Sequence, residues 1–168
     1  MSAVPHLDGV HHIKLPVGDL ARSLEWYESR LGYRLDVEFR TDGRLIGLAM
    51  RHPMGGPTFA LQLNPDMAKA ASGFDYFVIG VPSKDALEAL ADHLSELGEE
   101  HGGVKFGAIG WNLPLLHDPD GHEIRFYTTA HHTDLPESAI TTVNNPQEEF
   151  KRREIEYQEK ETVGNENE

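Results

Sequence analysis

The stretch Leu116-His-Asp-Pro-Asp-Gly-His-Glu-Ile-Arg-Phe-Tyr127 has the pattern of two strands joined by a tight turn. Pro119 supplies the fixed φ favoured at the second turn position, and Gly121 accepts the positive φ needed where the chain re-enters the sheet. In the second strand, alternation places Ile124 and Phe126 on one face. The opposite face carries three polar side chains, Glu123, Arg125 and Tyr127. The stretch therefore predicts a hairpin with one apolar and one polar face.

The segments that surround this hairpin occur twice along the chain. Each copy has the pattern of one strand, one amphipathic helix and three further strands. Val17, at the end of the first strand of the first copy, maps onto Val81 in the second copy, an offset of 64 residues. The first copy also contains the pair Asp42-Gly43, which is a strong signal for a two-residue hairpin turn. The pattern predicts two βαβββ modules produced by duplication.

The fold class that follows is α+β, with the two βαβββ modules forming a curled mixed sheet around a ligand trough. We expect a lead at residues 1–8 and one domain at 9–130, with its first module at 9–64 and its second at 74–130. Residues 131–168 form an acidic tail with ten acidic and four basic side chains. The tail is predicted to be partly helical, over 147–161, or disordered. It is either a solvated appendage or a helix that docks on a partner.

Composition excludes several classes of protein. The chain has 168 residues, no cysteine and a net charge of −13. Cysteine-based metal sites and thiolate chemistry are therefore excluded, and nucleic acid and anionic membranes are unfavourable partners. The N-terminus lacks the basic and apolar regions of a signal peptide, and no apolar run reaches the length of a membrane span. A soluble, cytoplasmic protein is the expectation.

Strand alternation also predicts which side chains line the trough. In each module the helix covers one face of the strands, so the opposite face is left for a ligand. The expected lining is His12, Lys14, Ala60, Gln62, Tyr76, Val78, Phe106, Trp111, Arg125 and Tyr127. Phe106, Trp111 and Tyr127 are expected to supply aromatic stacking surface. The cationic side chains favour an anionic oxygen group on the ligand, and Arg125 has a planar fork suited to a carboxylate, phosphate or enolate. The alternative for Arg125 is an internal ion pair with Glu123 or Asp75.

Two stretches resemble the vicinal-oxygen-chelate superfamily, which includes glyoxalase I, bleomycin-resistance proteins, fosfomycin-resistance enzymes and extradiol dioxygenases. They are Val10-His-His-Ile-Lys-Leu-Pro-Val-Gly-Asp-Leu-Ala-Arg-Ser-Leu-Glu-Trp-Tyr-Glu-Ser-Arg-Leu-Gly32 and Asp118-Pro-Asp-Gly-His-Glu-Ile-Arg-Phe-Tyr127. The resemblance implies paired βαβββ modules and a homodimer. It also implies that enzymes of the family bind a divalent metal through four strand positions.

Carried over to this chain, those four positions are held by His12, Gln62, Tyr76 and Arg125. Only His12 is a good ligand, and Gln62 is a weak neutral oxygen donor. A guanidinium at position 125 offers no lone pair and repels a cation. We therefore expect no cofactor and no metal at this site. A displaced metal held by His12, Gln62 and Glu123 is the disfavoured alternative.

The function expected from the sequence is binding of a small organic ligand, anionic or aromatic, by a glyoxalase/bleomycin-resistance-like protein that lacks the usual metal. The alternative is an enzyme with lyase, isomerase or dioxygenase-like activity. It would use a displaced divalent metal, or His12 and Tyr76 as an acid–base pair that moves a proton on a bound carbonyl compound. Whether the protein is catalytic, and the identity of its ligand, stay open at this stage.

Overall fold

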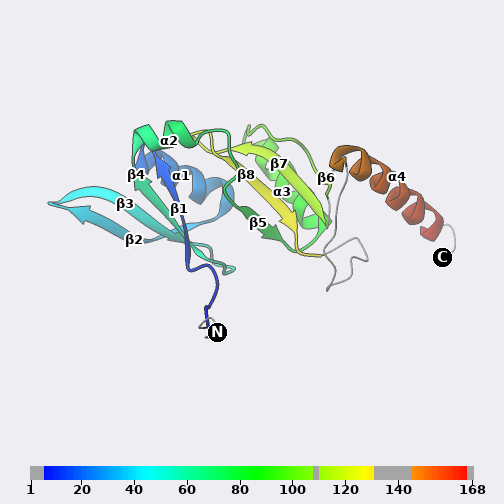
Figure 1. The fold of residues 1–168 in the computed structure, drawn as a ribbon, viewed down its shortest axis with the longest axis horizontal. Helices are drawn as coiled ribbons and strands as arrows, with labels where there is room; N and C mark the ends of the chain where they lie inside the picture. Colours follow the sequence, from blue (N-terminus) through cyan, green and yellow to red (C-terminus); the bar gives the residue numbers. More distant parts are fainter. Residues whose placement is uncertain (1–5, 108–109, 131–144, 166–168) are drawn as a thin grey trace, which may run out of the picture. The chain divides into compact units, whose positions relative to one another are not determined.

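A computed structural model describes residues 6–107, 110–130 and 145–165. The chain divides into two compact units (Figure 1). Unit 1 contains the chain up to Phe74 together with His117–Glu123, and unit 2 contains Asp75–Leu116 together with the chain from Ile124 onward. Each unit has a four-stranded sheet of its own.

The sheet of unit 1 has the strand order β1-β4-β3-β2. β1 (His12–Val17) runs parallel to β4 (Thr58–Leu63), and β3 (Arg44–Arg51) runs antiparallel to β4 and to β2 (Arg34–Thr41). Asp42 and Gly43, between β2 and β3, have φ values of 50° and 76°. Two successive positive φ values are what a type I′ hairpin turn requires. The predicted hairpin is therefore confirmed.

Helix α1 (Leu20–Leu31) covers one face of this sheet. Asp19 caps its first turn by accepting from the backbone N–H of Arg22 at 3.0 Å, and Gly32 ends it with a φ of 75°. The ring of Tyr27 lies 5.0 Å from the ring of Phe59 on β4, and both side chains are buried. Because α1 packs on the Phe59 face of the strands, the opposite face of the sheet is left open. The short helix α2 (Pro65–Ala71) follows β4.

Unit 2 repeats this topology, with the strand order β5-β8-β7-β6. β5 (Val78–Val81) runs parallel to β8 (Glu123–Thr128), and β6 (Lys105–Phe106) runs antiparallel to β7 (Trp111–His117). Helix α3 (Lys84–Glu96) buries Leu87 and Leu94 completely. The predicted duplication and the α+β class are confirmed. Each unit holds one four-stranded mixed sheet, and neither sheet closes into a barrel in the part of the chain that the structure describes.

The tail contributes helix α4 (Pro146–Asn165), which is longer than the helix predicted over 147–161. Arg152 and Arg153 both pair with Glu149, as expected for charges three and four residues apart on a helix. The helix contacts β6 of unit 2. Residues 131–144 and 166–168 of the predicted tail, and residues 1–5 of the lead, lie outside the described residues. No helix in the described ranges is long and apolar enough to cross a membrane.

The turn at Asp118–Gly121 is part of the core of unit 1. The N–H of Gly121 donates to the carbonyl of Asp118 at 2.9 Å, and Gly121 has a φ of 84°, so the predicted turn is confirmed. One carboxylate oxygen of Asp118 accepts from the backbone N–H groups of Asp120 and His122. The other accepts from the Tyr27 hydroxyl at 2.9 Å and from Nδ1 of His122 at 2.8 Å. Four donors therefore satisfy one buried carboxylate.

The second acid of the turn, Asp120, holds the start of α1. One of its oxygens accepts from the backbone N–H of Gly18 at 3.0 Å and from Nη2 of Arg22 at 2.8 Å. The other accepts from the hydroxyl of Ser23 at 3.2 Å. A carboxylate near the first turn of a helix also interacts favourably with the helix dipole. The turn thus fixes α1 through both of its aspartates.

The Tyr27 hydroxyl gives this arrangement a predictable pH dependence. Burial, and then the negative charge of Asp118, raise the pKa of Tyr27 well above its usual value of 10.0. A raised pKa means that the fold favours the neutral phenol. The contribution of Tyr27 is therefore fully present below the pKa of the unfolded chain and is lost as the pH rises above it.

We expect Tyr27→Phe to lower the free energy of unfolding by about 1–2 kcal/mol near neutral pH, because Asp118 loses a donor. As the pH rises past about 10, the variant should lose stability less steeply than the wild-type protein, because it has no buried phenol to ionise. Urea unfolding followed by circular dichroism across this range measures both effects. Parallel loss of stability in the two proteins above pH 10 would contradict the assignment.

Candidate functional site

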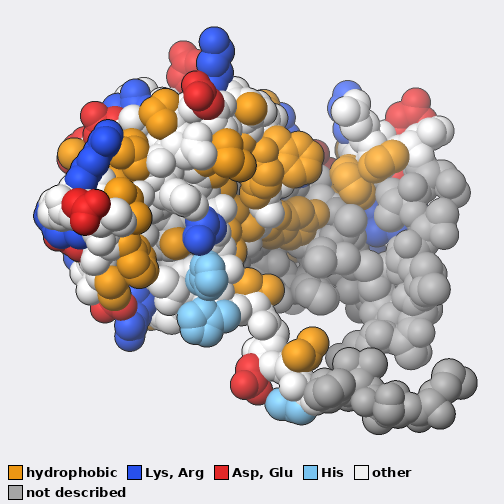
Figure 2. All heavy atoms as spheres, turned by 60° about the vertical axis from the view of Figure 1, so that its left-hand side comes forward, with side chains coloured by type: hydrophobic (Ala, Val, Ile, Leu, Met, Phe, Trp, Pro, Cys, Tyr) orange, Lys and Arg blue, Asp and Glu red, His pale blue; other side chains and the backbone are white. Residues whose placement is uncertain are grey.

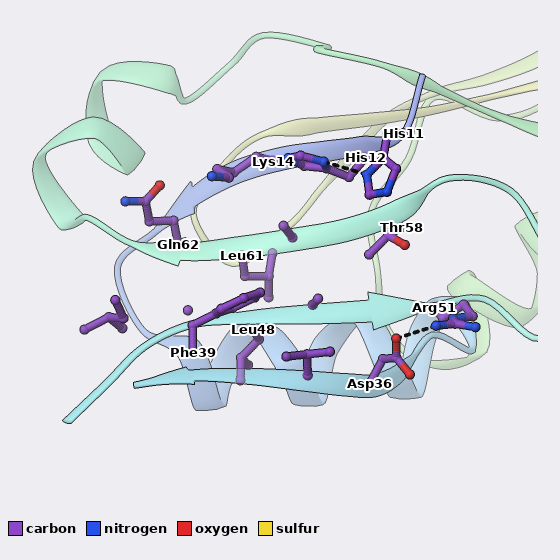
Figure 3. A pocket seen from close by; sticks show the side chains of 15 residues that line it. His11, His12, Lys14, Asp36, Phe39, Leu48, Arg51, Thr58, Leu61 and Gln62 are labelled. Atoms are coloured by element: carbon purple, nitrogen blue, oxygen red, sulfur yellow. Dashed lines mark hydrogen bonds and ion pairs between the residues drawn. The ribbon is translucent and has the colours of Figure 1, made fainter. Parts of the chain in front are cut away.

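The open face of the unit 1 sheet is hollowed to a volume of about 640 Å³ (Figure 3). Its floor consists of small residues on the two central strands, Gly47 and Ala49 on β3 and Ala60 on β4. Ala49 lies directly opposite Ala60, and Gly47 opposite Gln62. Because the central strands carry so little side-chain volume on this face, the sheet forms a basin between its larger outer side chains.

The outer strands supply the walls. Val37 and Phe39 stand on β2, and His12 and Lys14 stand on β1. Phe39 is 48% exposed, which is unusual for a phenylalanine in a sheet. The molecular surface in Figure 2 shows hydrophobic side chains beside histidine and basic side chains on this face of the molecule. The hollow thus has apolar and cationic walls.

The charges around the hollow are unequal. Nη2 of Arg51 lies 2.6 Å from the carboxylate of Asp36, so these two opposite charges largely cancel. The ammonium of Lys14 has neither an ion pair nor a hydrogen bond in the described part of the chain. Nδ1 of His12 lies 3.1 Å from Nδ1 of His11, a hydrogen bond in which one ring donates and the other accepts. The ammonium of Lys14 is therefore the uncompensated charge of the hollow.

Three of the residues predicted to bind a ligand come together here. His12, Lys14 and Gln62 all line the hollow, together with Ala60. Their shared face follows from strand alternation, because β1 and β4 are parallel and in register from His12–Thr58 to Val17–Leu63. The sequence identified these strands correctly because both are short, apolar on the helix side and free of bulges.

The remaining predicted residues belong to unit 2. Nη1 of Arg125 lies 3.3 Å from Oδ2 of Asp75, which is the internal ion pair considered as the alternative. Tyr76 precedes β5, which begins at Val78 and is shorter than expected. A Cβ at Gly107 would overlap the hydroxyl of Tyr127, so this ring lies over the hairpin backbone after β6. An acid–base pair of His12 and Tyr76 stays a prediction.

Phe106 and Trp111 differ from the expectation that they offer stacking surface to a ligand. Each is 5% exposed, and their rings pack edge to face with centroids 5.0 Å apart. Tyr157 of α4 contacts both rings, at 6.1 Å and 5.6 Å, and Nζ of Lys84 lies 4.5 Å from the Trp111 ring. The reason is that Trp111 stands on the buried side of β7, where α3 begins. These rings belong to the core of unit 2.

Sequence reasoning missed the β2 and β3 side of the hollow, above all Phe39 and Val37. The Asp42-Gly43 turn fixes Thr41 opposite Arg44, so pairing could in principle be counted back from the turn. The register shifts twice, however, between Phe39 and Arg40 and again between Leu35 and Val37. Each bulge changes which side chains face the hollow, and no local signal marks either one.

The strand register also revises the metal positions carried over from the resemblance. Lys14 pairs with Ala60, and Val78, which is the repeat counterpart of Lys14, pairs with Arg125. Ala60, and not Gln62, is therefore the counterpart of Arg125 in the first module. An alanine methyl provides no ligand atom, so this position contributes even less to a metal than predicted.

The other candidate ligands do not assemble into a metal site either. His12 lies opposite Thr58, and Gln62 is four residues further along β4. At about 3.3 Å per residue, the Cα positions of His12 and Gln62 are roughly 13 Å apart along the strands, too far for the two side chains to hold one ion. Glu123 is buried, and its N–H donates to the carbonyl of Phe74. The described ranges hold no cluster of three or more His, Asp or Glu side chains suited to a metal. The residues do not fit the metal of the family.

The fold and the repeated modules define a class of protein, and comparison with known sequences agrees. The model of the Glyoxalase/Bleomycin resistance protein/Dioxygenase superfamily matches residues 9–126. The chain therefore belongs to this superfamily. No curated protein sequence matches it.

Several solved structures are similar to this chain. An antibiotic-binding protein from Streptomyces sp. CB03234 is 20% identical with a TM-score of 0.59, over 76% of this chain and 98% of that one. A glyoxylase/bleomycin resistance protein/dioxygenase domain from Frankia sp. EAN1pec is 24% identical with a TM-score of 0.58, over 73% and 98%. A fosfomycin resistance protein from Listeria monocytogenes, complexed with Mn(II) and a phosphonic acid, is 15% identical with a TM-score of 0.55, over 73% and 90%. At these identities the likeness concerns the fold.

The lack of suitable ligands predicts the metal content of the protein. We expect untagged protein, purified without chelator, to contain no stoichiometric Mn, Ni, Zn or Fe by elemental analysis. Adding these ions should not raise the melting temperature, because His11 is the neighbour of His12 and the described ranges provide no third His, Asp or Glu side chain to complete a site. Near-stoichiometric metal that disappears in His12→Ala would contradict the strand register given above. An affinity tag must be absent, because it would bind the same ions.

The contact of Tyr157 with Trp111 can be followed by fluorescence. In a Trp26→Phe background, Trp111 is the only remaining tryptophan of the chain. We expect Tyr157→Ala to shift the emission of Trp111 to longer wavelength and to increase its quenching by acrylamide, because the ring loses its cover. Ile155→Ala, at an exposed position of the same helix, serves as the control. Unchanged emission in Tyr157→Ala would show that α4 does not cover Trp111 in solution.

Proposed function

We propose that this protein binds a small organic molecule in the hollow of unit 1, without the divalent metal that the resemblance implies for enzymes of the family. The hollow itself, with its apolar floor and charged edge, is the observation that carries the proposal. Its volume of about 640 Å³ lies within the range of pockets that hold small ligands, roughly 300–1,000 Å³.

The lining favours a ligand that is flat and largely apolar. Gly47, Ala49 and Ala60 present a smooth floor to one face of a ring, and Phe39 offers an aromatic side wall. His12, Lys14 and Gln62 supply polar atoms along the β1 side of the floor. An aromatic or polyketide-like molecule with an acidic oxygen matches this distribution of apolar and polar groups.

Binding without turnover is the role that the chemistry supports. No cluster suited to a metal occurs in the described ranges, and the closest polar partner of His12 is another histidine, His11. One structurally similar protein is described as antibiotic-binding, so a related fold is used to hold an organic molecule. Sequestration of a small compound, as in self-resistance, is the role we propose. The homodimer implied by the resemblance also stays a prediction, which light scattering would check.

The test fills the floor of the hollow. We expect Ala60→Leu to weaken binding of N-phenylnaphthylamine, a neutral aromatic probe, by at least about tenfold, because the larger side chain occupies the space of the ring. Ala89→Leu, the same change at an exposed position of α3, should leave the affinity unchanged. Fluorescence titration measures both, and circular dichroism confirms that each variant is folded.

Two outcomes would contradict the proposal. The first is no saturable binding of this probe, or of any compound in a broad thermal-shift screen of aromatic acids. The second is equal affinity of Ala60→Leu and the wild-type protein, which would place the probe elsewhere on the surface.

A further inference from the structure

We infer that Lys14 and Gln62 together form the binding point for an anionic oxygen of the ligand, so that the protein selects an aromatic acid over its neutral analogue. This inference rests on the proposed function, because it concerns the same hollow. It names the ligand class, a flat ring system with one carboxylate or sulfonate, and the two side chains that recognise the charge.

The strand register brings the two side chains together. Lys14 on β1 pairs with Ala60 on β4, and Gln62 is two residues further along β4 on the same face. Diagonal neighbours of this kind are about 7–8 Å apart, which is within reach of long side chains. Figure 3 shows Lys14 and Gln62 at one end of the hollow and Arg51, Asp36 and Thr58 at the other. Both side chains line the hollow.

The charge distribution selects Lys14 over the other cations. Arg51 is neutralised by Asp36 at 2.6 Å, and Arg125, in unit 2, pairs with Asp75. Within the described ranges the ammonium of Lys14 has no such partner, and the side-chain amide of Gln62 makes no hydrogen bond there. The chain as a whole carries a net charge of −13, so this local positive charge stands in acidic surroundings. An anion that enters the hollow would meet one ammonium whose charge is not balanced.

The chemistry of the pair suits a carboxylate or sulfonate. An ammonium attracts the charge as a compact cation, and the amide NH₂ of Gln62 can donate to a second oxygen of the same group. With the anion held there, the attached ring would extend over Ala60 and Gly47 toward Phe39, which lies opposite Gly47. The polar end and the apolar floor would thus orient one molecule between β1 and β2.

Two probes with closely related ring systems test this inference. Anilinonaphthalene sulfonate carries an anion, and N-phenylnaphthylamine lacks it. We expect Lys14→Met, which keeps an unbranched apolar stem but removes the charge, to weaken binding of the sulfonate probe by about tenfold. The same variant should change the affinity of the neutral probe by less than about twofold, because the floor and Phe39 are intact.

Matched variants separate a local contact from a change in net charge. Lys69→Met removes the same charge from the exposed surface of α2 and should leave the affinity of the sulfonate unchanged. Gln62→Glu places a carboxylate beside Lys14 and should weaken binding of the sulfonate probe at least as much as Lys14→Met does. Gln158→Glu adds the same charge on the exposed surface of α4 and should have no effect.

The outcomes distinguish failure of the inference from failure of the proposed function. If both probes bind and both are weakened in Ala60→Leu, but Lys14→Met affects them equally or not at all, the hollow binds ligands and the anion site is refuted. Equal losses in Lys14→Met and Lys69→Met also refute it, since the effect would then be one of net charge. If neither probe responds to Ala60→Leu, the hollow is not the binding site and both proposals fail.

Discussion

The carboxylate of Asp118 is the interaction on which unit 1 depends. A buried carboxylate is tolerated only when hydrogen bonds replace its lost hydration, and here four donors do so. One donor, the Tyr27 hydroxyl, comes from a residue 91 positions earlier in the chain. The network therefore fixes the turn locally and at the same time fixes α1 to it.

The position of α1 in turn determines which face of the unit 1 sheet is covered and which is hollowed. Tyr27 packs against Phe59 on one side of the strands, and both side chains are buried. The other side, as described within unit 1, is the hollowed one, and its central residues are small. A sheet with one helix-covered face and one hollowed face therefore combines a buried core with a pocket in only four strands. The fold and the hollow result from the same asymmetry.

Features that depend on local chemistry were predictable from the sequence. The turns at Asp118–Gly121 and Asp42-Gly43, and the caps at Asp19 and Ser83, follow from the conformations that these residue types favour. The duplication was visible because strands and helices recur at a constant offset. These features placed His12 and Lys14 on the open face without reference to coordinates.

Features that depend on pairing between distant segments were not predictable. Because of the bulges in β2, the predicted site did not include Phe39. The register of β4 makes Ala60, and not Gln62, the counterpart of Arg125. The contact of α4 with β6 and with Trp111 of β7 had no sequence signal, because Tyr157 stands in a helix that is polar on nearly every side. A single aromatic residue is enough for such a contact, but it leaves no periodic pattern to detect.

The turn at His117–Glu123 also has a consequence for how the protein is made. It belongs to unit 1, although more than forty residues of unit 2 precede it in the chain. A ribosome that has completed the first module has therefore not yet synthesised the acceptors for the Tyr27 hydroxyl and the Gly18 N–H. The contacts of Tyr27 and Gly18 with this turn can therefore form only after most of the second module has been synthesised. Such late closure of long-range contacts slows folding and lengthens the time during which the nascent chain can benefit from a chaperone.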